Sequence, residues 1–141
     1  TTASVEDVWR VLADGWSYSA WVVGTARIRA VETGFPAPGT TLHHSVGMWP
    51  LMLNDKTTVI DSEPNRRLVL QARAWPLGHA FVEITLTPTA TGSTISIAED
   101  AAGGPGEWLT IEPVRQPIIR ARNQEALRRL AFLAEQTDSP S

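Results

Sequence analysis

The spacing of hydrophobic residues divides the chain into a helical start, a middle region of strands and a helical end. Hydrophobic side chains recur at helical spacing over residues 5–12. Ser4 can cap this helix, and Asp7 three residues later can complete a capping box. Gly15 ends the helix. Residues 16–22 then predict a second short helix, so the chain opens with two helices in succession.

From Thr25 onward, hydrophobic and polar residues alternate with the period of a β-strand. The first strand runs from Thr25 to a turn at residues 32–39 that is rich in proline and glycine. Further strands are expected over about residues 40–48, 55–62, 67–75, 79–88 and 92–100. The short connections between successive strands favour an antiparallel meander.

The last third of the chain predicts one long amphipathic helix. Residues 101–107 (AAGGPGE) are expected to form a flexible link, and the helix follows over about residues 114–136. One face of this helix carries Ile119, Asn123, Leu127, Leu130 and Ala134. At a length of about 35 Å it can cross a small sheet and cover its apolar face. We therefore expect a single domain over residues 1–141, with residues 137–141 as a polar tail.

Composition and charge narrow the class of protein. The chain is 43% hydrophobic and 19% charged, which is typical of a soluble globular domain. No apolar stretch approaches the roughly 18 residues that span a bilayer, and no signal peptide opens the chain, so a cytoplasmic location is expected. The net charge of −3 argues against a nucleic-acid partner. The absence of cysteine excludes disulfides, thiolate nucleophiles and cysteine-ligated metals.

Four segments carry a resemblance to a known superfamily. They are SVEDVWRVLADGWSYSAW near the start, EPNRRLVL in the middle, and TPTATGSTISIAED and RNQEALRRLAFLAE towards the end. With these segments the chain resembles the polyketide cyclase and lipid-transport superfamily, also called START-like or Bet v 1-like, and within it the bacterial SRPBCC group. Members usually begin with a strand before the first helix. Only Thr1 and Thr2 could remain of that strand here, so the resemblance implies that it is largely missing.

The resemblance implies an α+β helix-grip fold. In this fold a curved antiparallel sheet wraps around the long C-terminal helix, two short helices lie near the N-terminus, and a cavity lies between the sheet and the long helix. Members of the superfamily bind lipids, sterols or polyketides, cyclise or dehydrate aromatic substrates, or act as Hsp90 co-chaperones. The fold alone does not select among these functions.

The adjacent histidines His43 and His44 suggest a metal site, but the strand period argues against one. Neighbouring residues of a strand point to opposite faces, so these two side chains cannot chelate one ion. No metal site is therefore predicted. His44 shares the more apolar face with Leu42, Val46 and Met48 and is expected to point inward. There it is a core residue, a polar anchor for a ligand, or a general acid or base.

Two further polar residues fall on inward faces. Alternation with Ile95 and Ile97 puts Glu99 on the apolar face at the end of its strand. Glu99 is either a carboxylate that reaches water at the rim or one that pairs with His44 or an arginine inside the cavity. Asn123 lies on the inward face of the long helix, where it either links the helix to a strand or contacts a ligand.

The segment MWPLML contains a proline that ends regular strand pairing. Its apolar side chains, Trp49 among them, either cap the core, form a cavity mouth or make a homodimer contact. Trp108, after the glycine-rich link, could form the other lip of a mouth. The chain holds six tryptophans, which could also fill the cavity themselves.

These observations favour a protein that binds a small hydrophobic or aromatic molecule, lipid-like or polyketide-like, without a cofactor. The expected apolar walls are Trp21, Met48, Trp49, Trp108 and Ile119, and the expected polar contacts are His44, Glu99 and Asn123. One alternative is a cofactor-independent polyketide cyclase or dehydratase in which His44 acts as acid or base. A second alternative is a protein-interaction module of the Hsp90 co-chaperone type.

Overall fold

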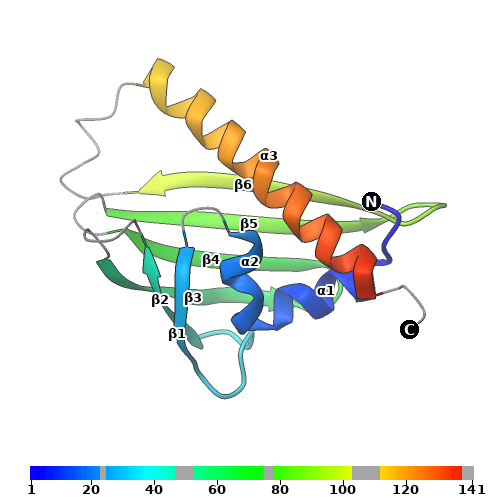
Figure 1. Ribbon diagram of the computed structural model, residues 1–141, viewed down its shortest axis with the longest axis horizontal. Coiled ribbons are helices and arrows are strands. Elements are labelled where there is room, and N and C mark those ends of the chain that lie inside the picture. Colours follow the sequence, from blue (N-terminus) through cyan, green and yellow to red (C-terminus); the bar gives the residue numbers. More distant parts are fainter. Residues whose placement is uncertain (23–24, 47–52, 75–77, 103–111, 138–141) are drawn as a thin grey trace.

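The computed structural model describes residues 1–22, 25–46, 53–74, 78–102 and 112–137. Two helices open the chain, six strands follow, and one long helix closes it (Figure 1). The helices are α1 (Val5–Ala13), α2 (Tyr18–Trp21, after a 3-10 turn at Gly15–Ser17) and α3 (Glu112–Thr137). The strands are β1 (Thr25–Val31), β2 (Thr41–Val46), β3 (Leu53–Glu63), β4 (Arg67–Ala74), β5 (Gly78–Pro88) and β6 (Ser93–Ala102).

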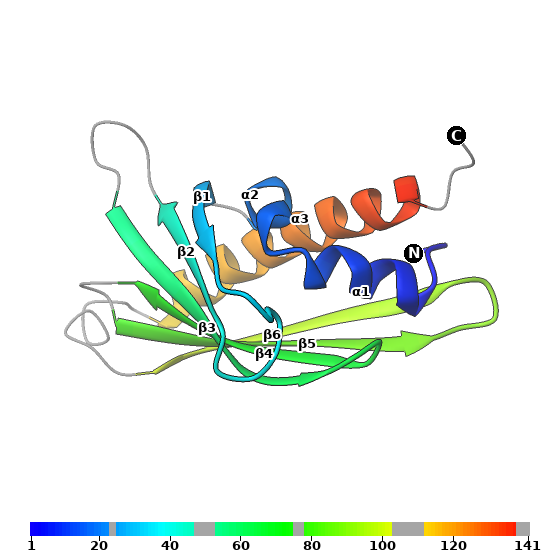
Figure 2. The same cartoon turned by 90° about the horizontal axis from the view of Figure 1, so that it is seen from below.

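The six strands form one antiparallel sheet in the order β1-β2-β3-β4-β5-β6, so each strand pairs with the next one along the chain. The sheet curves, and the helices lie together on its concave side, with α3 crossing the strands obliquely (Figures 1 and 2). This is the α+β helix-grip arrangement, as the sequence predicts. Within the described parts of the chain, none of the helices combines the length and apolar character needed to cross a membrane.

The start of α1 follows the prediction only in part. The Ser4 hydroxyl accepts a hydrogen bond from the Asp7 backbone nitrogen at 3.2 Å, as an N-cap should. The Asp7 carboxylate, however, pairs with Arg10 at 3.0 Å instead of reaching back to complete the capping box. At the other end, Gly15 is buried where the chain leaves α1. A Cβ atom there would lie 2.7 Å from the Leu42 side chain, so this close approach favours glycine.

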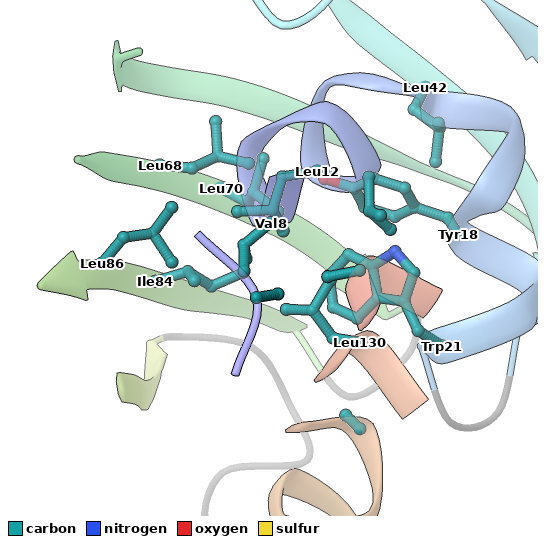
Figure 3. Close-up of a cluster of buried hydrophobic side chains, with 14 of the residues drawn as sticks. Val8, Leu12, Tyr18, Trp21, Leu42, Leu68, Leu70, Ile84, Leu86 and Leu130 are labelled. Carbon is teal, nitrogen blue, oxygen red and sulfur yellow. The ribbon is translucent and has the colours of Figure 1, made fainter. Parts of the chain in front are cut away.

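The hydrophobic core lies between one half of the concave face and the helices (Figure 3). Alternate residues of the inner strands supply the sheet side of this core: Leu42, Val59, Leu68, Leu70, Ile84 and Leu86. The helices supply Val8, Val11, Leu12, Tyr18, Trp21, Ala126, Leu130 and Ala134. Each large side chain among them contributes about 1.5–3 kcal/mol by leaving water. Among the α3 residues whose side chains are described, those buried in the core lie in the C-terminal half of the helix.

Several predicted boundaries are wrong. The second helix is only four residues long and follows a 3-10 turn, whereas one helix over residues 16–22 was expected. Ala101 and Ala102, which the sequence assigns to a flexible link at residues 101–107, belong to β6 and pair with Ala80 and His79 of β5. The remainder of that link lies outside the described residues.

The first residue of the chain lies against the outer edge of β6. The Thr1 nitrogen donates to the Ser93 carbonyl at 3.0 Å, and the Ser93 nitrogen donates to the Thr1 carbonyl at 3.1 Å. This reciprocal pair is the hydrogen-bonding pattern of one antiparallel strand position. The expectation that a first strand is largely missing stays a prediction.

Candidate functional site

The concave face of the two central strands changes character along its length. On β4 the inward positions run from Leu68 through Leu70 to Ala72, and on β5 they run from Ile84 to Val82 and Ala80. The large side chains at the start of each series are buried, whereas Ala72, Ala80 and Val82 are only half-buried. We call the part of the concave face formed by Ala72 and Ala80 the alanine end.

Strand register places these alanines in one row across the sheet. Thr57 of β3 lies opposite Ala72, Ala72 lies opposite Ala80, and Ala80 lies opposite Ala101 of β6. The neighbouring row, one step closer to the core, contains Val59, Leu70, Val82 and Glu99. Residues directly opposite each other on one face are side-chain neighbours. The alanine end therefore has Thr57 beside it on one side and Glu99 diagonally across on the other.

A buried polar pair marks the β2–β3 side of the alanine end. His44 and Thr57 are each 6% exposed, and Nε2 of His44 lies 2.9 Å from Oγ1 of Thr57. Leu42 is the residue directly opposite Thr57, so the histidine reaches the threonine diagonally from the next inward position of β2. His44 is thus buried, as the alternation predicts. Its role in binding or chemistry stays a prediction.

An ion pair marks the β6 side. The Glu99 carboxylate binds Nη2 of Arg122 on α3, and the Glu99 side chain is 10% exposed while that of Arg122 is 43% exposed. Glu99 therefore pairs with an arginine, but Arg122 is exposed, and a position of this pair inside a cavity stays a prediction. This pair joins α3 to the edge strand of the sheet at a point before the helix reaches the core.

For the other predicted site residues, the structure does not show a role in a binding site. Trp21 is 3% exposed and packs in the hydrophobic core beside Leu130 (Figure 3). Asn123 is half-buried on α3, next to Arg122. Met48, Trp49 and Trp108 lie outside the described residues, and Ile119 lies in α3 at a position whose side chain is not described. Their assignment to cavity walls stays a prediction.

Sequence reasoning missed three polar residues at or near this region. Thr57 belongs to an expected strand, but its contact with His44 depends on the register between two strands. Arg122 flanks the inward position Asn123, and only its long side chain brings it to Glu99. The third is Tyr18, the single tyrosine of the chain, whose position beside Trp21 on a short apolar helix was the available signal.

Tyr18 and Trp21 each hold a buried polar atom. Their ring centroids lie 4.8 Å apart, and Phe35 packs edge-on against Tyr18 at 5.8 Å. Among the described residues, neither the Tyr18 hydroxyl nor the Trp21 Nε1 has a hydrogen-bond partner. Burial raises the pKa of the Tyr18 hydroxyl, which therefore stays neutral at physiological pH. A buried polar group without a partner costs about 1–3 kcal/mol.

The described residues contain no group of three or more histidine, aspartate or glutamate side chains that could hold a metal ion. The described polar groups beside the alanine end include an imidazole, a hydroxyl and a carboxylate–guanidinium pair. Such groups can orient a ligand by hydrogen bonds, and an imidazole can also transfer a proton.

The family model for "Polyketide cyclase / dehydrase and lipid transport" matches residues 1–135 of the chain. The chain belongs to this family. No match to a curated protein was found.

Solved structures share the fold at low sequence identity. The di-domain aromatase/cyclase StfQ from the steffimycin biosynthetic pathway matches with a TM-score of 0.74 and 17% identity, over 96% of this chain and 48% of StfQ. The Zhui aromatase/cyclase from Streptomyces sp. R1128 matches with a TM-score of 0.68 and 18% identity, over 96% and 88% of the two chains. Ara h 8.0201 matches with a TM-score of 0.71 and 12% identity, over 96% and 93%. The chain spans about half the length of StfQ, and at these identities the likeness establishes the fold alone.

Proposed function

We propose that this family member binds a small hydrophobic or aromatic molecule, lipid-like or polyketide-like, between the concave face of the sheet and α3. The observation that carries this proposal is the alanine end. Small, half-buried side chains occupy inward positions of two central strands there, between a buried His44–Thr57 pair and the Glu99–Arg122 pair. The family's description, which includes lipid transport, supports the same class of ligand.

The free-energy cost of an empty cavity supports a bound ligand at this position. Interiors of folded domains are close-packed, and an empty apolar cavity costs about 24 cal/mol per Å³. For a small ligand pocket of ~300 Å³ this amounts to about 7 kcal/mol, which is comparable with the whole stability of a domain. Any apolar space over the alanine end is therefore better filled by a ligand or by water than left empty.

Binding is tested by filling the alanine end from within. The neutral fluorescent probe N-phenyl-1-naphthylamine should bind the wild-type protein. Ala80→Leu should weaken that binding by at least about tenfold, because its added carbon atoms occupy the space that the probe needs. The matched control is Ala98→Leu on β6, where the side chain is exposed on the outer face of the sheet. Equal probe affinity in the wild type and in Ala80→Leu would refute the proposal.

A second candidate function is catalysis of a cyclisation or dehydration without a cofactor. It is favoured by the His44 imidazole, which is buried beside the alanine end and oriented by the Thr57 hydroxyl. Two proteins of similar fold are named aromatase/cyclases, which supports the same candidate. For an enzyme, His44→Ala should abolish the cyclisation or dehydration of a substrate while the variant still binds the fluorescent probe. For a protein that only binds its ligand, there is no such activity to lose.

A further inference from the structure

The two polar pairs of the site lie at opposite margins of an apolar floor. Thr57 is on β3 and Glu99 on β6, which are three strand spacings apart, or about 14 Å along the sheet. Between them lie Ala72, Ala80 and Val82, none of which offers a polar side-chain atom. A molecule that lies across this floor therefore meets hydrogen-bonding groups at both of its ends.

The chemistry of the Thr57 margin favours an uncharged oxygen. A threonine hydroxyl carries no charge and can both donate and accept a hydrogen bond. It is 6% exposed and bound to His44, so protein atoms cover most of Thr57, and a ligand oxygen can reach only the small part that stays open. A charged group in such a position loses most of its hydration, and a carboxylate is compensated there only if the neighbouring His44 takes up a proton.

The Glu99 margin also favours a neutral group. Glu99 and Arg122 hold opposite charges in contact, so an added carboxylate would be repelled by Glu99 and an added ammonium by Arg122. A hydroxyl or carbonyl oxygen is repelled by neither. Arginine has five N–H donors, and the hydrogen bond from Arg122 to Glu99 uses one of them, so the guanidinium can also donate to such an oxygen.

From this arrangement we infer that the site selects a neutral, elongated molecule with a hydrogen-bonding oxygen at each end, rather than a fatty acid or another amphiphile with a single charged head. This inference rests on the proposed binding function. An amphiphile with one polar head leaves the hydrogen-bonding groups of one margin without a ligand partner. If its head is charged, that charge is not favoured at either margin.

A matched set of ten-carbon compounds tests the inference by displacement of N-phenyl-1-naphthylamine. The set contains 1-decanol, 1,10-decanediol and decanoate. If both ends of the binding site were apolar, the second hydroxyl of the diol would lose its hydration without gaining a hydrogen-bond partner. The diol would then bind at least tenfold more weakly than decanol, a difference of about 1.4 kcal/mol. We expect the reverse here, with the diol equal to or tighter than decanol and decanoate the weakest.

Two conservative variants locate the two ends. Thr57→Val should weaken the diol about tenfold relative to wild type, because it removes the hydroxyl at that end. Glu99→Gln should change the affinity for the diol little, because Arg122 can still donate to the ligand oxygen and the glutamine amide can also hydrogen-bond. Decanol should change little in either variant, because its one hydroxyl can use the margin that remains. Glu99→Gln should also strengthen decanoate, since Arg122 then lacks its counter-charge.

The controls lie on the outer face of the same sheet. Thr85→Val alters a half-buried threonine of β5, and Glu83→Gln alters a glutamate that pairs with Arg67 at 2.8 Å. Neither control should change the order of the three compounds, and circular dichroism checks that all four variants fold.

The outcomes separate the two proposals. If the probe binds but decanol exceeds the diol by tenfold or more, or decanoate binds best, the inference about ligand chemistry is overturned while the binding function stands. If neither the probe nor any of the three compounds binds, the binding function fails and the inference fails with it.

Discussion

At the scale of single residues, burial of polar atoms distinguishes this core from an ordinary apolar one. Tyr18 is 3% exposed, and its hydroxyl has no hydrogen-bond partner among the described residues. It packs between Trp21 and Phe35, whose rings offer no conventional acceptor. The ionised form of a phenol is therefore strongly disfavoured in the folded state, because nothing there replaces its hydration.

We predict that Tyr18 does not ionise in the folded protein near its ordinary pKa of 10.0. It is the only tyrosine in the chain, so the ultraviolet absorption of tyrosinate reports this one group. Absorption should stay flat as the pH passes 10.0 in buffer, and it should rise with a midpoint near 10.0 in concentrated urea. A midpoint near 10.0 in the folded protein would contradict the buried position of the hydroxyl.

The raised pKa of Tyr18 also determines whether the free energy of unfolding rises or falls as the pH increases. Because the folded-state pKa lies above the unfolded-state value, the unfolded chain releases this proton first as the pH rises. The Tyr18 contribution to the free energy of unfolding is thus complete below pH 10.0 and declines above it. Tyr18→Phe should remove this part of the decline, which urea titrations of both proteins at several alkaline pH values can measure.

At the scale of elements, the N-terminal residues tie the β5–β6 hairpin to the end of α3. Thr1 exchanges two backbone hydrogen bonds with Ser93, and its hydroxyl donates to the Glu135 carboxylate at 2.5 Å. The Ser93 hydroxyl donates to the Ala3 carbonyl at 2.8 Å. These contacts require a close approach of two backbones at Gly92, where a Cβ atom would lie 2.1 Å from the Thr1 carbonyl oxygen.

Gly92→Ala should therefore displace the first residues from β6. Since the clash is with backbone atoms and not with a flexible side chain, we expect a loss of about 1–3 kcal/mol in the free energy of unfolding. The neighbouring Thr91→Ala alters an exposed side chain and should stay within about 0.5 kcal/mol of wild type. Urea denaturation measures both. Equal stability of the two variants would mean that the Thr1–Ser93 pairing does not contribute to folding.

Sequence patterns predicted the element order and the sheet connectivity because these depend on local signals. Periodicity separates helix from strand, and short turns between strands force neighbours to pair. Element ends were predicted less well. Ala101 and Ala102 were assigned to a link, since an alanine pair before glycine carries no strand signal, yet pairing with β5 keeps them in β6. Tertiary pairing here overrides local propensity.

The candidate site was only partly predictable for a related reason. Alternation along one strand identified His44 and Glu99 as inward residues. Their partners, Thr57 and Arg122, could not be found in this way, because one contact depends on the register between two strands and the other on the approach of α3 to the sheet edge. Alternation gives the face of a residue, whereas a contact needs the relative placement of two elements.

At the scale of the whole molecule, the two halves of the concave face carry different kinds of side chain. One half is filled by α1, α2 and the C-terminal half of α3, which bury the large side chains of the sheet (Figure 2). The other half carries the alanine end and the Glu99–Arg122 pair, and the first α3 residues whose side chains are described, residues 120–122, are exposed. A helix that packs on the core through its C-terminal half and pairs with the sheet edge through Arg122, near its middle, stabilises the domain through both contacts.

This division predicts that the protein's stability depends on a bound ligand. A ligand that binds only the folded state at ~100 times its Kd adds about 2.7 kcal/mol to the free energy of unfolding, which corresponds to roughly 10 °C in Tm for a domain of this size. We expect native mass spectrometry of the protein as purified to show an apolar adduct. Removal of that adduct by unfolding, organic extraction and refolding should lower Tm by several degrees.

The Ala80→Leu variant is the control for this experiment, because its leucine fills the alanine end permanently. Its Tm should be the same before and after extraction, and its native mass should show no adduct. A wild-type protein with a clean mass and an unchanged Tm after extraction would mean that its own side chains or water fill the space above the alanine end. In that case the small residues would serve packing alone, and the helix-grip scaffold would act through some other surface.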